Sequence, residues 1–198
     1  MEIAQDPEFC SMIDRLRDEI HEGGEADRKA FEELVASDDH EEFARVLTAP
    51  GQPLWARELA AFRLGLAGDP RAFEALVLLL NHREPERCVS AAYALARLGD
   101  PRTARAAAAL ATNELRVAYA LFPVRLLTDL RAPESVPTLV AVLERRLASD
   151  DPHWRVGLAC VEGLGALADR RSWAALLAPL PHPRLGGGPW PALARLVD

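Results

Sequence analysis

A four-residue motif occurs twice in this chain and sets the length of its repeating unit. Gly68-Asp69-Pro70-Arg71 is followed thirty-one positions later by Gly99-Asp100-Pro101-Arg102, and each copy separates two apolar segments. Self-similarity at a period of about one helical hairpin is typical of repeat proteins. The sequence therefore predicts an array of stacked helical hairpins.

The residue types of this motif suit a turn between two helices. Glycine adopts the left-handed conformation at a helix C-terminus, aspartate accepts N–H bonds at the next N-terminus, and proline fits the first helical position. Apolar residues at helical spacing flank the first copy: Trp55, Leu59, Phe62, Leu66, Phe73, Leu76, Val77 and Leu80. Neither helix can bury its apolar face alone, so we expect the hairpins to stack on one another.

The repeats are predicted to span residues 53–180, as about four hairpins. The third is less regular, because Pro123 should kink its first helix, and its second helix should end near Leu147. In the fourth, the Leu-Gly and Asp-x-Arg positions recur one hundred residues after those of the first. Residues 181–198 are expected to form a flexible Pro/Gly linker and a short closing helix anchored by Trp190.

Residues 1–52 are predicted to form an acidic N-terminal helical cap. The first fifty residues hold fifteen Asp or Glu and only five Lys or Arg, whereas the remainder is slightly basic. Asp6 before Pro7 predicts the start of a helix that Gly23-Gly24 ends, and two shorter helices should precede the break at residues 49–53. The expected apolar stripe of the first helix comprises Phe9, Ile13, Leu16 and Ile20. A polar cap shields the apolar end of a stacked array.

Composition excludes several classes of protein. With 49% apolar and 27% charged residues the chain falls outside the disordered range. Its three cysteines, Cys10, Cys88 and Cys160, have no CxxC spacing, so we expect no disulfide or zinc site and a core position for each. The first residues contain no apolar run, so we expect neither a signal peptide nor a membrane anchor, and a cytoplasmic protein.

The segment Ala91-Ala92-Tyr93-Ala94-Leu95-Ala96-Arg97-Leu98-Gly99-Asp100-Pro101-Arg102 resembles the HEAT-like repeats of the phycobilin-lyase type. This resemblance extends over about residues 53–180. It implies a bacterial-type protein with an all-α, armadillo-like fold. In this fold a right-handed α–α superhelix has its second helices lining a concave face. Members of that family are mostly adaptors and scaffolds, with a few enzymes among them.

The resemblance implies that polar positions early in the second helices contact the partner. These positions are Arg71, Glu74, Arg102, Arg105, Glu134, Thr138, Arg171 and Ser172. A structural alternative is that several of them, Arg71 and Arg102 above all, form an Asp–Arg ladder between successive turns.

Two enzymatic relatives of the fold provide a comparison. The deoxyhypusine hydroxylases hold two iron ions with His-Glu pairs in successive first helices, but the corresponding positions here read Glu58-Leu59, Val89-Ser90 and Leu158-Ala159. His21-Glu22 and His40-Glu41 lie outside the repeats, and we expect surface histidines there. The alkylpurine DNA glycosylases need a basic channel with aromatic side chains. The chain has four tryptophans, but its pI of about 5.3 and its single lysine oppose that function.

The sequence thus predicts a non-catalytic scaffold or adaptor, without metal or cofactor, that binds a protein or peptide on the concave face. We find no nucleophile motif or phosphate-binding loop that would indicate chemistry. The alternatives are a nucleic-acid-binding protein of the alkylpurine DNA glycosylase type, or a lyase or chaperone-like accessory factor, for which no residue can be assigned.

Overall fold

The structure is a computed structural model that describes residues 5–21 and 24–197. In this part of the chain the regular elements are all helices, and no β-strand occurs, which confirms the all-α prediction. None of the described helices combines the length and apolar character that crossing a lipid bilayer requires. The predicted helix end at Gly23 lies outside the described residues.

The chain divides into two compact units, residues 1–100 and 101–198. The division falls within the second Gly-Asp-Pro-Arg motif. The helices before residue 52, where the sequence predicts a boundary, belong to the same unit as the helices that follow them.

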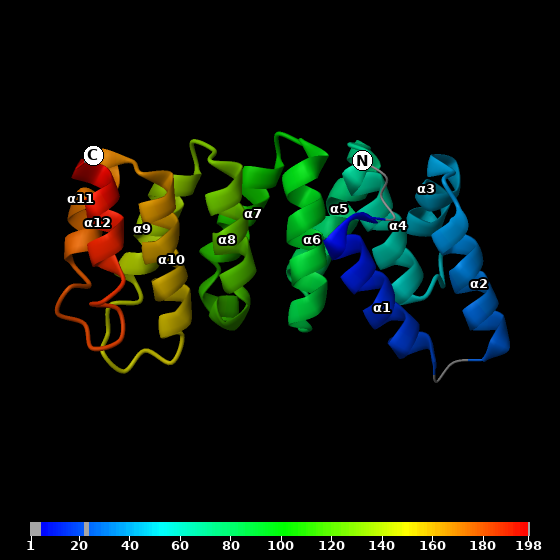
Figure 1. Cartoon of the computed structure of the whole chain (residues 1–198), viewed down its shortest axis with the longest axis horizontal. Helices are drawn as coiled ribbons and strands as arrows, with labels where there is room; N and C mark the ends of the chain where they lie inside the picture. The colour runs from blue at the N-terminus through cyan, green and yellow to red at the C-terminus, as the bar shows by residue number, and fades with distance from the viewer. Residues whose placement is uncertain (1–4, 22–23, 198) are drawn as a thin grey trace. The chain divides into compact units, whose positions relative to one another are not determined.

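The first unit is built around one central helix. Its elements are α1 (Pro7–His21), α2 (Glu25–Ala36), α3 (His40–Thr48), α4 (Leu54–Leu66), the 3₁₀ turn η2 (Pro70–Ala72), α5 (Phe73–Leu80) and α6 (Pro85–Leu98). Helix α4 contacts α2, α3, α5 and α6, and α1 lies across it, in contact with α2 and α6 (Figure 1). The side chain of Phe62 on α4 stacks on Phe9 of α1 and on Tyr93 of α6, with ring centroids 6.0 Å apart in each pair.

The N-terminal helix starts where the sequence predicts, and its apolar stripe packs into the first unit. Asp6 caps it by accepting the N–H groups of Glu8 and Phe9 at 2.9 and 3.2 Å. All four residues of its predicted apolar stripe are buried. This burial is against the sides of α2, α4 and α6, so α1 straps the first unit and contributes to its core.

The second unit contains the remaining elements. These are α7 (Thr103–Ala111), the 3₁₀ segment η3 (Glu114–Tyr119), α8 (Leu121–Leu130), α9 (Ser135–Glu144), α10 (Trp154–Leu167), the 3₁₀ turn η4 (Arg170–Ser172), α11 (Trp173–Leu177) and α12 (Pro189–Val197). Helix α10 contacts α8, α9 and α12 (Figure 1). A Cβ on Gly165 of α10 would lie 2.5 Å from Cβ of Ala192, so α12 packs closely only because glycine occupies that position.

Pro123 does not kink a long helix, contrary to the sequence-based prediction. The helix is already interrupted within η3, where Arg116 has φ −135° and ψ 32°, and α8 begins at Leu121. Pro123 therefore occupies the first turn of α8, where a missing N–H removes no intrahelical bond. The second helix of this repeat, α9, ends at Glu144 rather than near Leu147.

The C-terminal segment also differs from its prediction. Trp190 is 65% exposed and does not anchor α12, which instead buries Ala192, Leu193 and Leu196. The three consecutive glycines belong to a packed loop rather than an open linker. The N–H of Gly186 donates to the carbonyl of His182 at 2.9 Å, and a Cβ on Gly186 would lie 2.4 Å from the carbonyl oxygen of Leu180.

Two of the three cysteines occupy the predicted core positions. Cys88 and Cys160 are buried, and burial raises the pKa of the Cys160 thiol to about 12, which keeps it in the unreactive protonated form. Cys10 is exposed, because it follows the buried Phe9 and lies off the apolar stripe of α1. Its predicted core position is wrong.

The same left-handed backbone conformation follows four helices, although only two of them are followed by the Gly-Asp-Pro-Arg motif. A residue with positive φ follows each of α4, α6, α8 and α10: Gly68, Gly99, Arg131 and Ala168, with φ between 49° and 73°. Asp69 and Asp169 then accept the N–H groups of Arg71 and Arg171 at 2.9 and 2.8 Å. The left-handed turn is thus shared by these four helix ends, two of which have glycine at that position.

A matched pair of substitutions tests the role of the left-handed turn. We expect Ala168→Gly to raise the free energy of unfolding, and Gly99→Ala to lower it, each by about 1 kcal/mol, because a Cβ is disfavoured in the left-handed region. A Cβ on Gly99 meets no atom within 4 Å, so the cost there is conformational. Urea titrations followed by circular dichroism measure both changes. Shifts of the same sign for the two variants would contradict the proposed role of the turn.

Candidate partner-binding groove

The structure places the predicted contact residues at the starts of the second helices, with one correction. Arg71 lies in η2 and Glu74 in α5 of the first unit, and both are exposed. The remaining positions lie in the second unit, where Arg102, Arg105 and Arg171 are exposed and Glu134 and Thr138 are half-buried. Ser172 is fully buried and donates its hydroxyl to the carbonyl of Asp169 at 2.6 Å. Its side chain completes a turn, so its prediction as a contact residue is corrected.

Two Asp–Arg pairs lie within single turns, at Asp69–Arg71 and at Asp169–Arg171. Nε of Arg71 donates to both carboxylate oxygens of Asp69 at 3.0 Å, and Arg171 binds Asp169 in the same way. Arg71 also binds Glu41 of α3 at 2.9 Å. Hydrogen bonds from Arg71 hold the pKa of Asp69 below its usual value. Both arginines are therefore already neutralised by carboxylates of their own unit.

A groove between α3, α4 and α5 brings two of the predicted residues together. It has a volume of about 320 Å³, and Arg71 and Glu74 line it. Leu54 and Leu78 lie in the same groove and are 40% and 74% exposed, respectively. Large apolar side chains exposed beside charged groups are typical of partner-binding surfaces.

Arg57 adds a positive charge to this groove. Its Nη2 donates to the carbonyl oxygen of Ala49 at 3.2 Å, beyond the end of α3. Its Nε is buried and has no hydrogen-bond partner among the residues that the structure describes, and no carboxylate in that part of the chain pairs with the guanidinium. The charge of Arg57, unlike that of Arg71, is uncompensated within the described protein.

Sequence reasoning missed Leu78, although a signal was present. Residues 76–80 form an uninterrupted apolar run within α5. A helix cannot bury five consecutive residues on one face, so at least one of them must face solvent. Arg57 carried no comparable signal, because its pairing depends on residues distant in the sequence.

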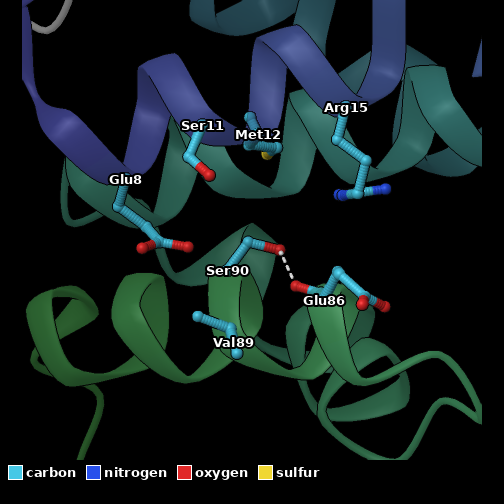
Figure 2. A pocket seen from close by; sticks show the side chains of 7 residues that line it. All are labelled: Glu8, Ser11, Met12, Arg15, Glu86, Val89 and Ser90. Carbon is cyan, nitrogen blue, oxygen red and sulfur yellow. Dashed lines mark hydrogen bonds between the residues drawn. The ribbon is translucent and has the colours of Figure 1, made fainter. Parts of the chain in front are cut away.

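A second hollow lies between α1 and α6 of the first unit (Figure 2). Its volume is about 410 Å³, and Met12 and Val89 contribute apolar side chains from its two sides. Glu8 also lines it, and burial together with the neighbouring Asp6 raises the pKa of the Glu8 carboxyl. The hydroxyl of Ser90 donates to Glu58 at 3.0 Å. No histidine lines this hollow, so it lacks the hydroxyl–imidazole pair of a serine hydrolase.

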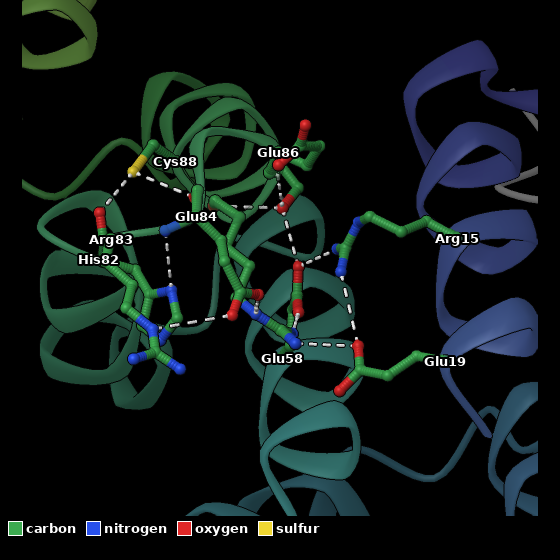
Figure 3. A network of polar contacts seen from close by, with 10 residues as sticks. Arg15, Glu19, Glu58, His82, Arg83, Glu84, Glu86 and Cys88 are labelled. Carbon is green, nitrogen blue, oxygen red and sulfur yellow. Dashed lines mark hydrogen bonds and ion pairs between the residues drawn. The ribbon is translucent and has the colours of Figure 1, made fainter. Parts of the chain in front are cut away.

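A network of charged side chains lies beside this hollow and joins three helices (Figure 3). Glu58 on α4 is only 1% exposed, and it accepts hydrogen bonds from Arg15 of α1 and Arg87 of α6. Arg87 is 3% exposed and also binds Glu84 at 2.6 Å and Glu19 at 2.7 Å. Every charged group in the buried part of the network therefore has an opposite partner.

The network stabilises charged side chains in a buried environment. Burial alone disfavours the positive charge on Arg87, yet Glu58, Glu84 and Glu19 together hold the pKa of its guanidinium above the usual value. A complete buried network of this kind adds little net stability, whereas removing one member leaves an uncompensated charge. The network thus fixes α1 in one position against α4 and α6.

The structure gives no support for a metal site in the residues it describes. Within them, no cluster of three or more His, Cys, Asp or Glu side chains is arranged to hold a metal ion. Glu22, of the His21-Glu22 pair, lies outside the described residues. His40 is exposed, and the neighbouring Glu41 binds Arg71.

The four tryptophans do not share one environment. Trp55 is buried edge-on against Phe31, with ring centroids 5.7 Å apart, so it belongs to the core. Trp154 is half-buried, with the guanidinium groups of Arg155 and Arg184 within 6 Å of its ring centroid. Trp173 and Trp190 are exposed.

Comparison with known proteins adds no assignment. No protein-family model matches the chain, and no curated protein matches it in sequence.

The ion network predicts a large effect for one substitution. We expect Glu58→Ala to lower the free energy of unfolding by about 3 kcal/mol, because Arg87 then keeps a buried charge without its closest partner. Hydrogen exchange of the α1 amides should accelerate in the same variant. Glu33→Ala on the exposed side of α2 is the control, with a change within about 0.5 kcal/mol. Equal effects of the two substitutions would contradict the role of the network.

The contact between Asp6 and Tyr93 predicts a pH dependence. Although burial opposes its charge, hydrogen bonds from Tyr93 and two N–H groups lower the pKa of Asp6 in the folded protein. A lowered carboxyl pKa gives stability that is present above the unfolded value, about 3.9, and is lost as the pH falls through the folded value. Tyr93→Phe should therefore be destabilising at neutral pH, and its difference from the native protein should shrink in acid.

Urea titrations from neutral pH to about pH 3 measure this difference. The control is Tyr119→Phe in η3, a half-buried tyrosine of the second unit. A deficit in Tyr93→Phe that stays constant across the whole range would show that Asp6 is not its cause.

Proposed function

We propose that this protein is a non-catalytic scaffold or adaptor of the HEAT-like α-solenoid type, acting in the cytoplasm, which binds a protein or peptide partner in the groove between α3, α4 and α5. The observation that carries this proposal is the exposure of Leu54 and Leu78 in a groove that also contains Arg71 and Glu74. Apolar side chains supply most of the affinity of such interfaces, and charged groups at the edge supply orientation and specificity.

The charge distribution supports a protein partner over nucleic acid. Binding to a phosphate backbone depends on unpaired positive charge. Arg71 and Arg171 both bind carboxylates of their own unit, and Trp55 is buried in the core. The exposed Trp173 and Trp190 favour the nucleic-acid alternative. The experiment therefore tests that alternative as well.

The experiment is affinity capture from a lysate of the source cells, with and without nuclease, followed by mass spectrometry. The native protein should retain a stoichiometric protein partner that survives nuclease. Leu78→Glu should lose it, because a carboxylate replaces an apolar contact in the groove. Leu115→Glu is the control, since Leu115 is 95% exposed in η3 and lies outside the groove.

Three outcomes would contradict the proposal. Equal capture by the native protein and Leu78→Glu would show that the groove does not bind the partner. Loss in both variants would show that added surface charge, and not the groove, determines capture. Recovery of nucleic acid alone, released by moderate salt, would favour the nucleic-acid-binding alternative.

A further inference from the structure

We propose that the occupant of this groove is a short amphipathic helix of the partner, which carries two apolar side chains and a carboxylate beside them. This inference rests on the proposed function and specifies the chemistry of the same site. It follows from the length of α5 beside the groove, from the placement of the leucines that line the groove and from the unequal compensation of its arginines.

The element that runs along the groove has the length of a short helical segment. Helix α5 lies along one side of it and has eight residues, which corresponds to about 12 Å of helix axis, or two turns. Leu47 and Thr48, at the end of α3, lie on the other side, and Leu54 belongs to the first turn of α4. A ligand helix of similar length presents side chains three or four residues apart on one face, which suits a pair of apolar contacts.

The two ends of the groove differ in polarity. The polar end lies at the start of α5, where Arg71 binds Asp69 and Glu41, and Glu74 is exposed. The other end, which has the exposed leucines, lies at the close of α5, where Leu78, Leu79 and His82 line the groove. Leu54 and Arg57 line this groove from the first turn of α4. An apolar anchor therefore fits best between Leu54 and Leu78.

The charge of Arg57, unpaired in the described part of the chain, determines which charge the ligand is expected to have at this end of the groove. Arg57 has no carboxylate partner among the described residues, whereas Arg71 has two. A carboxylate on the ligand beside its apolar anchor would compensate the charge of Arg57, and a guanidinium–carboxylate pair in a partly desolvated groove is a strong orienting contact. Glu74 repels a second acidic group at the other end. The geometry therefore assigns an acidic group to the Leu54–Leu78 end of the ligand.

The test is selection from a displayed library of random peptides against the purified full-length protein. We expect enriched peptides to contain two apolar residues three or four positions apart and an adjacent Asp or Glu. Binding of these peptides to Leu78→Glu should fall by at least about tenfold, as for a central interface contact. Leu115→Glu should bind them as the native protein does.

A second variant tests the charge separately. Arg57→Gln should keep affinity for the apolar pattern but lose the preference for peptides with Asp or Glu over otherwise identical peptides with Asn or Gln. Circular dichroism of each variant checks that it remains folded. If Arg57→Gln does not fold, the same preference is measured on the native protein at rising salt, where it should decline.

Several results would overturn the inference. These are enrichment of basic or wholly polar peptides, no enrichment at all, and equal binding to the native protein and Leu78→Glu. A native dimer that becomes a monomer in Leu78→Glu, measured by light scattering, would show that a second copy fills the groove. If lysate capture depends on Leu78 while the selected peptides are basic, the ligand chemistry is wrong and the proposed function stands. If neither experiment depends on Leu78, both fail.

Discussion

The first unit depends on the compensation of one buried carboxylate. Glu58 lies on the central helix α4 with almost no exposure, and a charge in that position is stable only with opposite charges and hydrogen bonds around it. Arg87 of α6 and Arg15 of α1 supply the charges, and Ser90 supplies a further hydrogen bond. Three helices are thereby held at one point, and the acidic N-terminal segment becomes part of the core.

The position of α1 explains why the groove remains open. Helix α1 contacts α2 and α6 and binds α4 through the ion network, whereas α3, α4, η2 and α5 line the groove. Helix α1 and the groove thus lie on different sides of α4. Leu78 is exposed because no element among the described residues of the first unit covers that side of α5. A groove with exposed apolar side chains and a stable core therefore coexist in a unit of about a hundred residues.

Local signals made several elements predictable. Asp6 before Pro7 and the stripe that begins at Phe9 specify α1, because capping and amphipathic spacing act within a few residues. Other predictions were wrong where tertiary context decided. Pro123 avoids a kink because the helix restarts just before it, and Trp190 stays exposed because α12 buries a different face. Arg131 and Ala168 take the left-handed turn without glycine, which no sequence rule would indicate.

The sequence by itself determined the helices, their turns and the starts of the second helices, where Arg71 and Glu74 were predicted as contacts. These features follow from interactions between residues close in the chain. Only the tertiary structure decided that Glu58 pairs with Arg87, twenty-nine positions away, and that Arg87 pairs with Glu19, sixty-eight positions away. It also decided that Leu54, Arg57 and Leu78 share one groove. Such contacts depend on how helices pack, and periodicity specifies which face is buried but not which partner covers it.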